Sequence, residues 1–321
     1  MHQQINRSKN SAEEALLALN PWADAHYERI KQFLSGHDDA DRHGGTDLTI
    51  MSARDETFRA TRREACLFRH ENGFAKWNDW ATKMAKIRQE FIKTRLDKAL
   101  WEQLAFVDFS GHHFNGATEF ATFVFPGAAD FSNATFSSHI WFNGAKFEDE
   151  VTFADCLFEA DCWFEQSRFQ NSANFERTKW QGRAELRCVT FQSAVLFTSS
   201  QFHKGAWFRG TRFIGPSEFT NAQFMKDAGF GGCQFDDTAR FTSAVFSDNA
   251  GFEETVFAKQ AAFDEARFEH IAWFTMAEFQ ASVTFDKARF SKGRHFDDVI
   301  LTQSKSVVSQ QQDLLQQELG N

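Results

Sequence analysis

Phenylalanine recurs from Phe109 to Phe296 at alternating steps of five and six residues. Seventeen 11-residue periods follow one another without an insertion or a deletion, and 33 of the 35 periodic positions are Phe. The other two are Trp180 and Leu186. The residue two before each periodic position is Ala, Ser, Thr, Cys or Val in 31 of the 35 cases, and polar residues fill the intervals. This stretch is therefore a tandem repeat of short units.

The spacing of the Phe residues within each period distinguishes a β-strand from an α-helix. On an α-helix a step of five residues rotates a side chain by roughly 140°, so successive Phe side chains would point to different sides. In a strand, residues i and i−2 share one face, which matches each Phe and the small residue before it. The polar intervals, rich in Ser, Asn, Asp, Gly, Lys and Glu, suit solvated corners. The pattern predicts a β-solenoid over residues 106–301.

Individual units resemble a known repeat. Examples are Ala134-Thr135-Phe136, Ala145-Lys146-Phe147, Ala222-Gln223-Phe224 and Ala266-Arg267-Phe268. They look like pentapeptide repeats, A-x-[LF]-x-x, and the resemblance implies a right-handed quadrilateral β-helix with the Phe and the preceding small residue packed inside. Every second unit here carries a sixth residue, so two units give 11 residues and a four-sided coil is expected to take 22.

The residue before alternate Phe positions offers a check on this coil length. Trp occurs in only one of two alternating columns, which runs Glu119, Trp141, Trp163, Glu185, Trp207, Gly229, Gly251, Trp273, His295. A coil of 11 residues would merge the two columns, whereas a coil of 22 places them on opposite walls. We therefore predict a mainly β protein with about eight to nine coils, about 40 Å long at roughly 4.8 Å per coil.

Helical patterns flank the predicted solenoid. Residues 1–105 predict a hairpin over 11–35, a polar linker over 36–47, a short helix over 56–68 and a long amphipathic helix over 78–104. Because a terminal coil exposes unpaired strand edges, we expect the long helix to cap the solenoid. Residues 302–321 predict a C-terminal amphipathic helix over 304–319. It either caps the other end or forms a homodimer, as C-terminal helices of related pentapeptide-repeat proteins often do.

The amino-acid composition narrows the classes of protein to which this chain can belong. The chain has 40 Phe and one Tyr, as expected for a sealed interior that gives a phenol no partner. No apolar run approaches the roughly 20 residues that span a bilayer, and the first residues have no signal-like apolar core. A cytoplasmic bacterial protein without membrane association is predicted. Cys156, Cys162 and Cys233 occupy small inward positions, and no cysteine pair has metal-ligand spacing, so neither a disulfide nor a zinc site is predicted.

Charge is unevenly distributed. The net charge is −9, and residues 148–165 and 236–269 are acidic. The middle is basic and includes the candidate contact residues Arg177, Arg183, Arg187, Arg209 and Arg212. The ends and the middle of the solenoid are therefore expected to present opposite potentials.

No catalytic motif is present. The sequence has no P-loop, no GxGxxG, no HExxH and no GxSxG, and its 11 histidines are scattered. The run from His37 to His43 is interpreted as a solvated loop. A filled solenoid also offers no cleft that would desolvate an acid–base pair. We therefore predict no enzyme, and no catalytic, cofactor or metal site.

Two surface features are candidates for binding. Trp141, Trp163, Trp207 and Trp273 would point outward along one wall, where three interpretations stay open: cover by the N-terminal helices, contact with a second copy, or contact with another protein. The basic band is either a set of solvated corners or a contact for phosphate or an acidic partner.

The favoured function is a non-enzymatic protein-interaction scaffold whose partner the sequence does not identify. The alternative is a DNA mimic that binds DNA gyrase or another nucleic-acid-binding protein, as some pentapeptide-repeat proteins do. The net charge supports mimicry, whereas the basic middle and the helical N-terminal region count against it. A bacterial effector or toxin-neutralising partner is the third class, and direct nucleic-acid binding is not expected.

Overall fold

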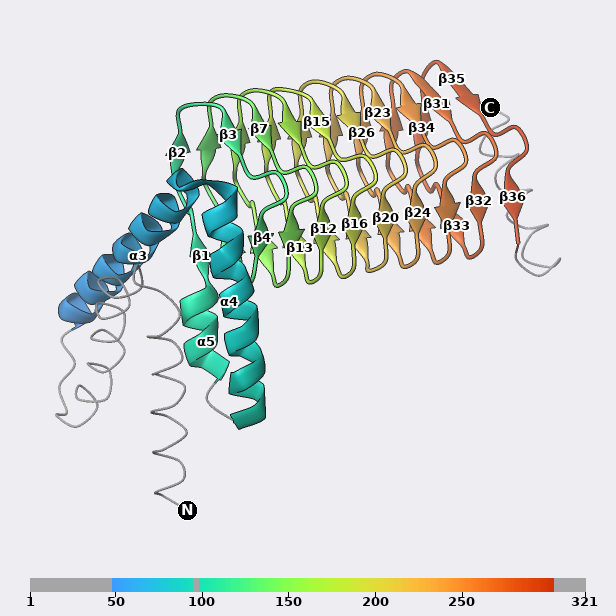
Figure 1. Cartoon of the computed structure of the whole chain (residues 1–321). Helices are drawn as coiled ribbons and strands as arrows, with labels where there is room; N and C mark the ends of the chain where they lie inside the picture. The colour runs from blue at the N-terminus through green and yellow to red at the C-terminus, as the bar shows by residue number, and fades with distance from the viewer. Residues whose placement is uncertain (1–47, 95–97, 303–321) are drawn as a thin grey trace. The chain divides into compact units, whose positions relative to one another are not determined.

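The computed structural model describes residues 48–94 and 98–302 (Figure 1). The hairpin, the polar linker with its His37–His43 run and the C-terminal helix over 304–319, all predicted above, lie outside the described residues. Within them, three helices come first: α3 (Leu48–Glu71), α4 (Gly73–Thr94) and α5 (Lys98–Ala105). Short strands make up the rest of the described elements.

Thirty-six strands in the described part of the chain form four parallel sheets of nine strands each. Sheet A contains β1 (Val107–Asp108), β5 (Ala129–Asp130), β9 (Val151–Thr152), β13 (Ala173–Asn174), β17 (Val195–Leu196), β21 (Ser217–Glu218), β25 (Ala239–Arg240), β29 (Ala261–Ala262) and β33 (Val283–Thr284). Sheet B contains β2 (His113–Phe114), β6 (Thr135–Phe136), β10 (Leu157–Phe158), β14 (Lys179–Trp180), β18 (Gln201–Phe202), β22 (Gln223–Phe224), β26 (Val245–Phe246), β30 (Arg267–Phe268) and β34 (Arg289–Phe290).

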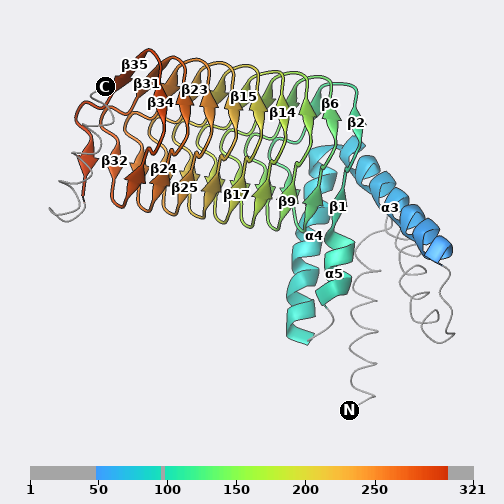
Figure 2. The same cartoon turned by 180° about the vertical axis from the view of Figure 1, so that it is seen from behind.

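Sheet C contains β3 (Thr118–Glu119), β7 (Ile140–Trp141), β11 (Cys162–Trp163), β15 (Ala184–Glu185), β19 (Ala206–Trp207), β23 (Ala228–Gly229), β27 (Ala250–Gly251), β31 (Ile271–Trp273) and β35 (Gly293–His295). Sheet D contains β4 (Val124–Phe125), β8 (Lys146–Phe147), β12 (Arg168–Phe169), β16 (Thr190–Phe191), β20 (Arg212–Phe213), β24 (Gln234–Phe235), β28 (Val256–Phe257), β32 (Glu278–Phe279) and β36 (Ile300–Leu301). The coils that carry these strands stack in chain order, and the reverse view shows the same ladder (Figures 1 and 2).

The strand register confirms a coil of 22 residues. Cys162 pairs with Ala184, and Glu278 pairs with Ile300 in β36. The register thus continues to the last strand, about nine coils in all. Sheets A and C lie on opposite walls of each coil, because the ring of Phe219, which follows β21, meets that of Phe230, which follows β23, edge to face at 5.4 Å across the interior.

Phenylalanine rings fill the interior in ladders. Along one ladder, Phe219 and Phe241 stack with ring centroids 4.8 Å apart and planes 4° apart. Trp180 and Leu186, the two exceptions in the repeat, are as fully buried as their Phe neighbours. Parallel stacking along the axis and edge-to-face contact across it are both favourable arrangements of aromatic rings. The core is therefore continuous from coil to coil.

Two kinds of corner alternate around each coil. In the five-residue corner the N–H of Ala134 donates to the carbonyl of Phe131 at 3.0 Å, and Asn133 between them has φ 58°. A positive φ at this place is the mark of a type II turn. It recurs every 11 residues from Gly111 to Asp298, at 14 non-glycine residues and four glycines. The six-residue corners in the described region contain no positive φ, which locates the extra residue of the repeat.

Several polar side chains at the small inward positions have buried partners, although the buried hydroxyl of Ser167 has none in the structure. The thiol of Cys156 donates to the carbonyl of Phe131 at 2.8 Å, and the hydroxyl of Thr255 donates to the carbonyl of Phe230 at 2.8 Å. Both carbonyls belong to the preceding coil. A buried donor without a partner would cost the full desolvation of that group, so these contacts explain how Cys, Ser and Thr replace Ala in the core.

The helices form a separate unit with the first strands. This unit comprises the described residues up to Ser110 together with Val124–Asp130, and the remaining coils form the second unit. Trp77 of α4 is fully buried in the first unit and donates from Nε1 to the carbonyl of Val124 in β4 at 2.8 Å. It also stacks on Phe109 with centroids 6.1 Å apart. The amphipathic stripe of α4 thus packs against β-strand residues, while a cap on the solenoid as a whole stays a prediction.

The prediction of a single helix over residues 78–104 is wrong. α4 ends at Thr94 and α5 begins at Lys98. Trp101 of α5 donates from Nε1 to the carbonyl of Met84 at 2.9 Å, although a continuous helix would separate residues 17 apart by about 25 Å. The two helices therefore pack side by side. The physical reason is burial, because α4 gains Trp101 of α5 as a partner and this indole is buried.

Removal of a Phe ring from a central coil should destabilise the protein more than removal of one from the last coil. Phe241 is fully buried, whereas Phe290 in the last coil is partly exposed. Phe241→Ala is expected to lower the free energy of unfolding by about 3–5 kcal/mol, because a buried ring is lost and a cavity remains. Phe290→Ala is expected to lower it less. Urea denaturation followed by far-ultraviolet circular dichroism measures both, and equal losses would contradict continuous core packing.

Candidate interaction face of the solenoid

The outward side chains of sheet C form one column on the second unit. In most of these strands the first residue is buried and the second points outward. We call this wall the tryptophan face; its column is Glu119, Trp141, Trp163, Glu185, Trp207, Gly229, Gly251, Trp273 and His295. The four indoles are neither fully buried nor fully exposed. The structure thus places all four predicted Trp residues on one wall.

Neighbouring indoles stack where two Trp residues are adjacent in the column. Trp141 and Trp163 have ring centroids 5.3 Å apart and planes only 4° apart. His139, from the corner before β7, lies 5.4 Å from the ring of Trp163. Trp273 stacks in the same way on His295, with centroids 6.2 Å apart. The 22-residue register places these rings one above the other, so each orders its neighbour.

Glu185 interrupts the column between Trp163 and Trp207. Its side chain is 7% exposed, and its Oε2 has no hydrogen-bond partner in the structure. Burial raises the pKa of this carboxyl above its ordinary value, and the Arg187 guanidinium, 3.3 Å away, opposes the rise. A buried and incompletely paired carboxylate is costly for the fold. It is the electrostatically strained position of this face.

A hollow opens where the column contains glycine. Gly229 and Gly251 form its floor, and Trp207 and Trp273 stand at its two ends, three coils apart. Its volume is about 440 Å³. A Cβ on Gly229 would lie 2.7 Å from Cε3 of Trp207, so this indole leans over the glycine. The hollow exists because two coils in succession lack an outward side chain in the column.

The rim of the hollow is mainly acidic. The carboxylates of Asp227, Glu253 and Glu254 line it together with one cation, Arg209. Glu253 reaches across the floor, since a Cβ on Gly251 would lie 2.6 Å from its Oε2. Nδ2 of Asn249 donates to Asp227 at 3.0 Å and so holds one carboxylate in place. The hollow combines aromatic walls with negative charge.

A scan against protein families matches this region. The model for pentapeptide repeats (9 copies) matches residues 120–168, 164–223 and 219–267. Residues 120–267 of the solenoid are pentapeptide repeats. Searches of the curated proteins and of the solved structures each gave no match to the chain.

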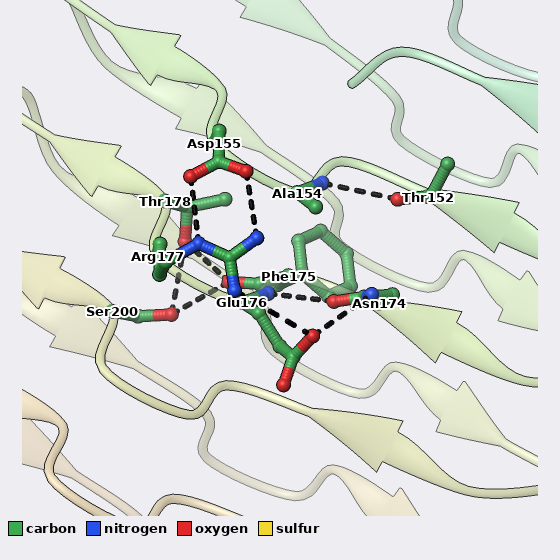
Figure 3. Close-up of polar contacts among 9 residues, drawn as sticks. All are labelled: Thr152, Ala154, Asp155, Asn174, Phe175, Glu176, Arg177, Thr178 and Ser200. Carbon is green, nitrogen blue, oxygen red and sulfur yellow. Dashed lines mark hydrogen bonds and ion pairs between the residues drawn. The ribbon is translucent and has the colours of Figure 1, made fainter. Parts of the chain in front are cut away.

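The pentapeptide-repeat register pairs much of the basic band with acidic residues. Arg177 donates from Nε and Nη2 to the two carboxylate oxygens of Asp155, one coil earlier, at 2.8 and 2.7 Å (Figure 3). These bonds lower the pKa of Asp155 below its ordinary value. Arg183 donates from Nε and Nη2 to one carboxylate oxygen of Asp161, again one coil earlier, at 3.0 and 2.8 Å. Charges that are separate in the sequence become neighbours when the chain advances by one coil.

The five predicted arginines do not form one patch. Arg183, Arg187 and Arg209 border the tryptophan face, whereas Arg177 lies at a five-residue corner and Arg212 lies in β20 of sheet D. Arg212 pairs with Asp236 at 2.8 Å. Exposed pairs of this kind contribute little to stability. They do reduce the difference in electrostatic potential that the sequence predicts between the ends and the middle of the solenoid.

Metal clusters, disulfides and membrane-spanning helices are absent from the described residues. No group of three or more His, Cys, Asp or Glu residues in them is arranged to hold a metal ion, and their five cysteines are all free thiols. No helix among them is long and apolar enough to cross a membrane.

Sequence reasoning missed the hollow. Gly229 and Gly251 belong to the predicted column, but their meaning depends on Trp207 and Trp273 lying at either end. The signal that could have found it is two successive glycines in a column that elsewhere carries Trp, with Gly231 and Gly232 in the adjoining corner. Asp227, Asn249, Glu253 and Glu254 gave no separate signal, because acidic residues occur in many corners.

The strain at Glu185 is expected to appear in the pH dependence of stability. A raised pKa in the folded state means that the ionised carboxylate destabilises the fold above that pKa, and that the cost vanishes below the unfolded value of about 4.3. Glu185→Gln should therefore be more stable than the wild type at pH 7, and this advantage should disappear toward pH 4.

The control variant, Asp155→Asn, is expected to change stability at pH 7 in the opposite direction. The pKa of Asp155 is lowered, so its contribution is present above the unfolded value of about 3.9 and is lost below it. Asp155→Asn should be slightly less stable than the wild type at pH 7, because the pair with Arg177 is exposed, and the difference should vanish at acid pH. Thermal unfolding of the three proteins between pH 3 and pH 8 measures both effects. A Glu185→Gln variant that is less stable at pH 7 would contradict the assignment.

Proposed function

We propose that this protein is a non-enzymatic scaffold that binds another protein through the tryptophan face. The observation that carries the proposal is the column of partly exposed indoles, with the hollow between two of them, on one wall of a solenoid held in register. Pentapeptide-repeat β-helices are generally non-enzymatic repeat scaffolds, which agrees with this function.

Energetics supports the tryptophan face as a contact surface. Trp is enriched among the residues that contribute most to protein interfaces, because a large rigid ring buries much area at a low cost in side-chain entropy. Trp141 and Trp163 are already stacked in the free protein. Binding would therefore require little reordering of these rings, and a partner would cover surface that now contacts water.

Three expectations belong to this proposal. The first is a cytoplasmic location. The second is pairing with a second copy through the segment 304–319. The third is capping of the solenoid by the helical region, for which the contacts of Trp77 with Phe109 and Val124 are the support.

Mimicry of DNA is the second candidate, and the net charge of −9 is the observation that favours it. Against it stand cations that are interleaved with the acidic residues, such as Arg240 paired with Glu218 on sheet A and Lys226 within 3.8 Å of Asp248. A surface that imitates a phosphate backbone would present carboxylates without such neighbours.

The scaffold proposal is tested by removing exposed indoles. Trp141→Ser with Trp163→Ser should leave the circular dichroism spectrum unchanged, because both residues point outward, and should abolish recovery of a partner in affinity capture from the native host. The matched control is Trp180→Phe, which alters an inward Trp and should keep the partner. If the double variant unfolds, the Trp column has a structural role. If the wild type recovers no partner protein, the proposal is contradicted.

The mimicry candidate is tested with DNA gyrase. If the protein imitates DNA, it should change the rate of supercoiling at low salt, and reversal of charge in Glu253→Lys with Asp264→Lys should abolish the effect. Added salt should weaken it, since exposed charges are screened. An unchanged supercoiling rate over a broad range of protein concentration would exclude this candidate.

A further inference from the structure

The hollow of the tryptophan face has the size of a binding site. Its volume of about 440 Å³ lies within the range of roughly 300–1,000 Å³ that small organic groups occupy in proteins. Its floor consists of backbone at Gly229 and Gly251, with the indole of Trp207 leaning over the first glycine and the carboxylate of Glu253 lying over the second. The corner residues Gly231 and Gly232 also belong to the lining. Four glycines on two neighbouring coils thus remove side chains from the same place.

The charges of the hollow select a cationic occupant. Three carboxylates, those of Asp227, Glu253 and Glu254, face one guanidinium, that of Arg209, so the lining carries a net charge of −2. An apolar or anionic occupant would desolvate these carboxylates without pairing them, which costs free energy. A cation would pair with them instead, and this favours a positively charged group.

The aromatic ends favour the same occupant. Indole is the best of the aromatic side chains at attracting a cation to its face. The chain already provides an example, since the guanidinium of Arg187 lies 5.9 Å from the ring centroid of Trp207. Trp273 at the other end stacks on His295 on the side away from the hollow. Its opposite side borders the hollow.

We propose that the hollow docks a basic segment of a partner protein, with an arginine or lysine side chain between Trp207 and Trp273 and paired with Glu253. The inference rests on the proposed scaffold function and names the chemistry of its partner. Two coils of floor span about 10 Å at roughly 4.8 Å per coil, which matches about three residues of extended chain. Charge complementarity and this length fit a short basic peptide segment.

The proposal is tested with a fluorescein-labelled tetra-arginine peptide and the full chain, by fluorescence anisotropy. The wild type should bind this peptide and should not bind a tetra-citrulline peptide, which has the same shape without charge. Glu253→Gln should weaken binding by about tenfold, as expected when one charge-assisted hydrogen bond is lost. Glu165→Gln, at the equivalent position four coils earlier on the same face, should leave binding unchanged. Equal effects of the two variants would overturn the site.

A filling variant provides an independent test. Gly251 does not have a left-handed backbone, and the nearest atom to an added Cβ is the flexible end of Glu253. The column carries Trp at Trp163 and Trp273, so Gly251→Trp should fold and place an indole in the hollow. Peptide binding should be lost while the circular dichroism spectrum and melting temperature are retained. Retained binding by this folded variant would overturn the proposal.

The remaining outcomes separate the possible occupants and the two proposals. Displacement of the peptide by tetramethylammonium chloride at concentrations as low as those of the peptide would assign the hollow to a free small cation and overturn peptide docking. A partner that is lost in the Trp141→Ser and Trp163→Ser variant but kept by Gly251→Trp would leave the scaffold function standing and overturn only this inference. Peptide binding by a wild type that captures no partner would contradict the scaffold proposal instead.

Discussion

The structure depends on the stacking of phenylalanine rings inside a coil of constant length. Rings such as Phe219 and Phe241 lie 4.8 Å apart, close to the spacing of neighbouring strands, so aromatic packing and backbone pairing are satisfied by the same repeat. A single inserted residue would move every later ring out of its ladder. This explains why 17 periods pass without a change of length and why a strained turn residue such as Thr122, which is β-branched and has φ 61°, is tolerated.

The same constraint organises the surface. Because each coil adds 22 residues, outward residues 22 apart become neighbours whatever their chemistry, as Arg177 above Asp155 and Trp141 above Trp163 show. A charge map read along the chain therefore misrepresents the potential in space. Two acidic residues of the stretch 148–165, Asp155 and Asp161, form ion pairs with the arginines that follow it. The core thus determines which surface residues meet, although it does not determine what they are.

The tryptophan face shows how distinct surface features can be added to such a repeat. Its inward residues maintain the ladder, so its outward residues are free to vary, and they include stacked indoles, a strained Glu185 and a hollow of glycines. A filled core leaves no deep cleft along this face, and the hollow arises only where side chains are missing. This favours recognition of side chains from a partner over chemistry on an enclosed substrate.

By itself the sequence determined the repeat, the coil of 22 residues, the inward ladder and the column that holds Trp141, Trp163, Trp207 and Trp273. These follow from strand periodicity, which is a local property, and from the identity of the residues. It did not determine that α4 and α5 pack side by side, because Trp101 and Met84 meet only through tertiary packing. Nor did it reveal that the hydroxyl of Thr178 accepts a hydrogen bond from Nε1 of Trp180 at 2.9 Å, which allows an indole to replace Phe in the core. The burial of Glu185 and the hollow between Trp207 and Trp273 were likewise decided in three dimensions, since both depend on what lies one or more coils away.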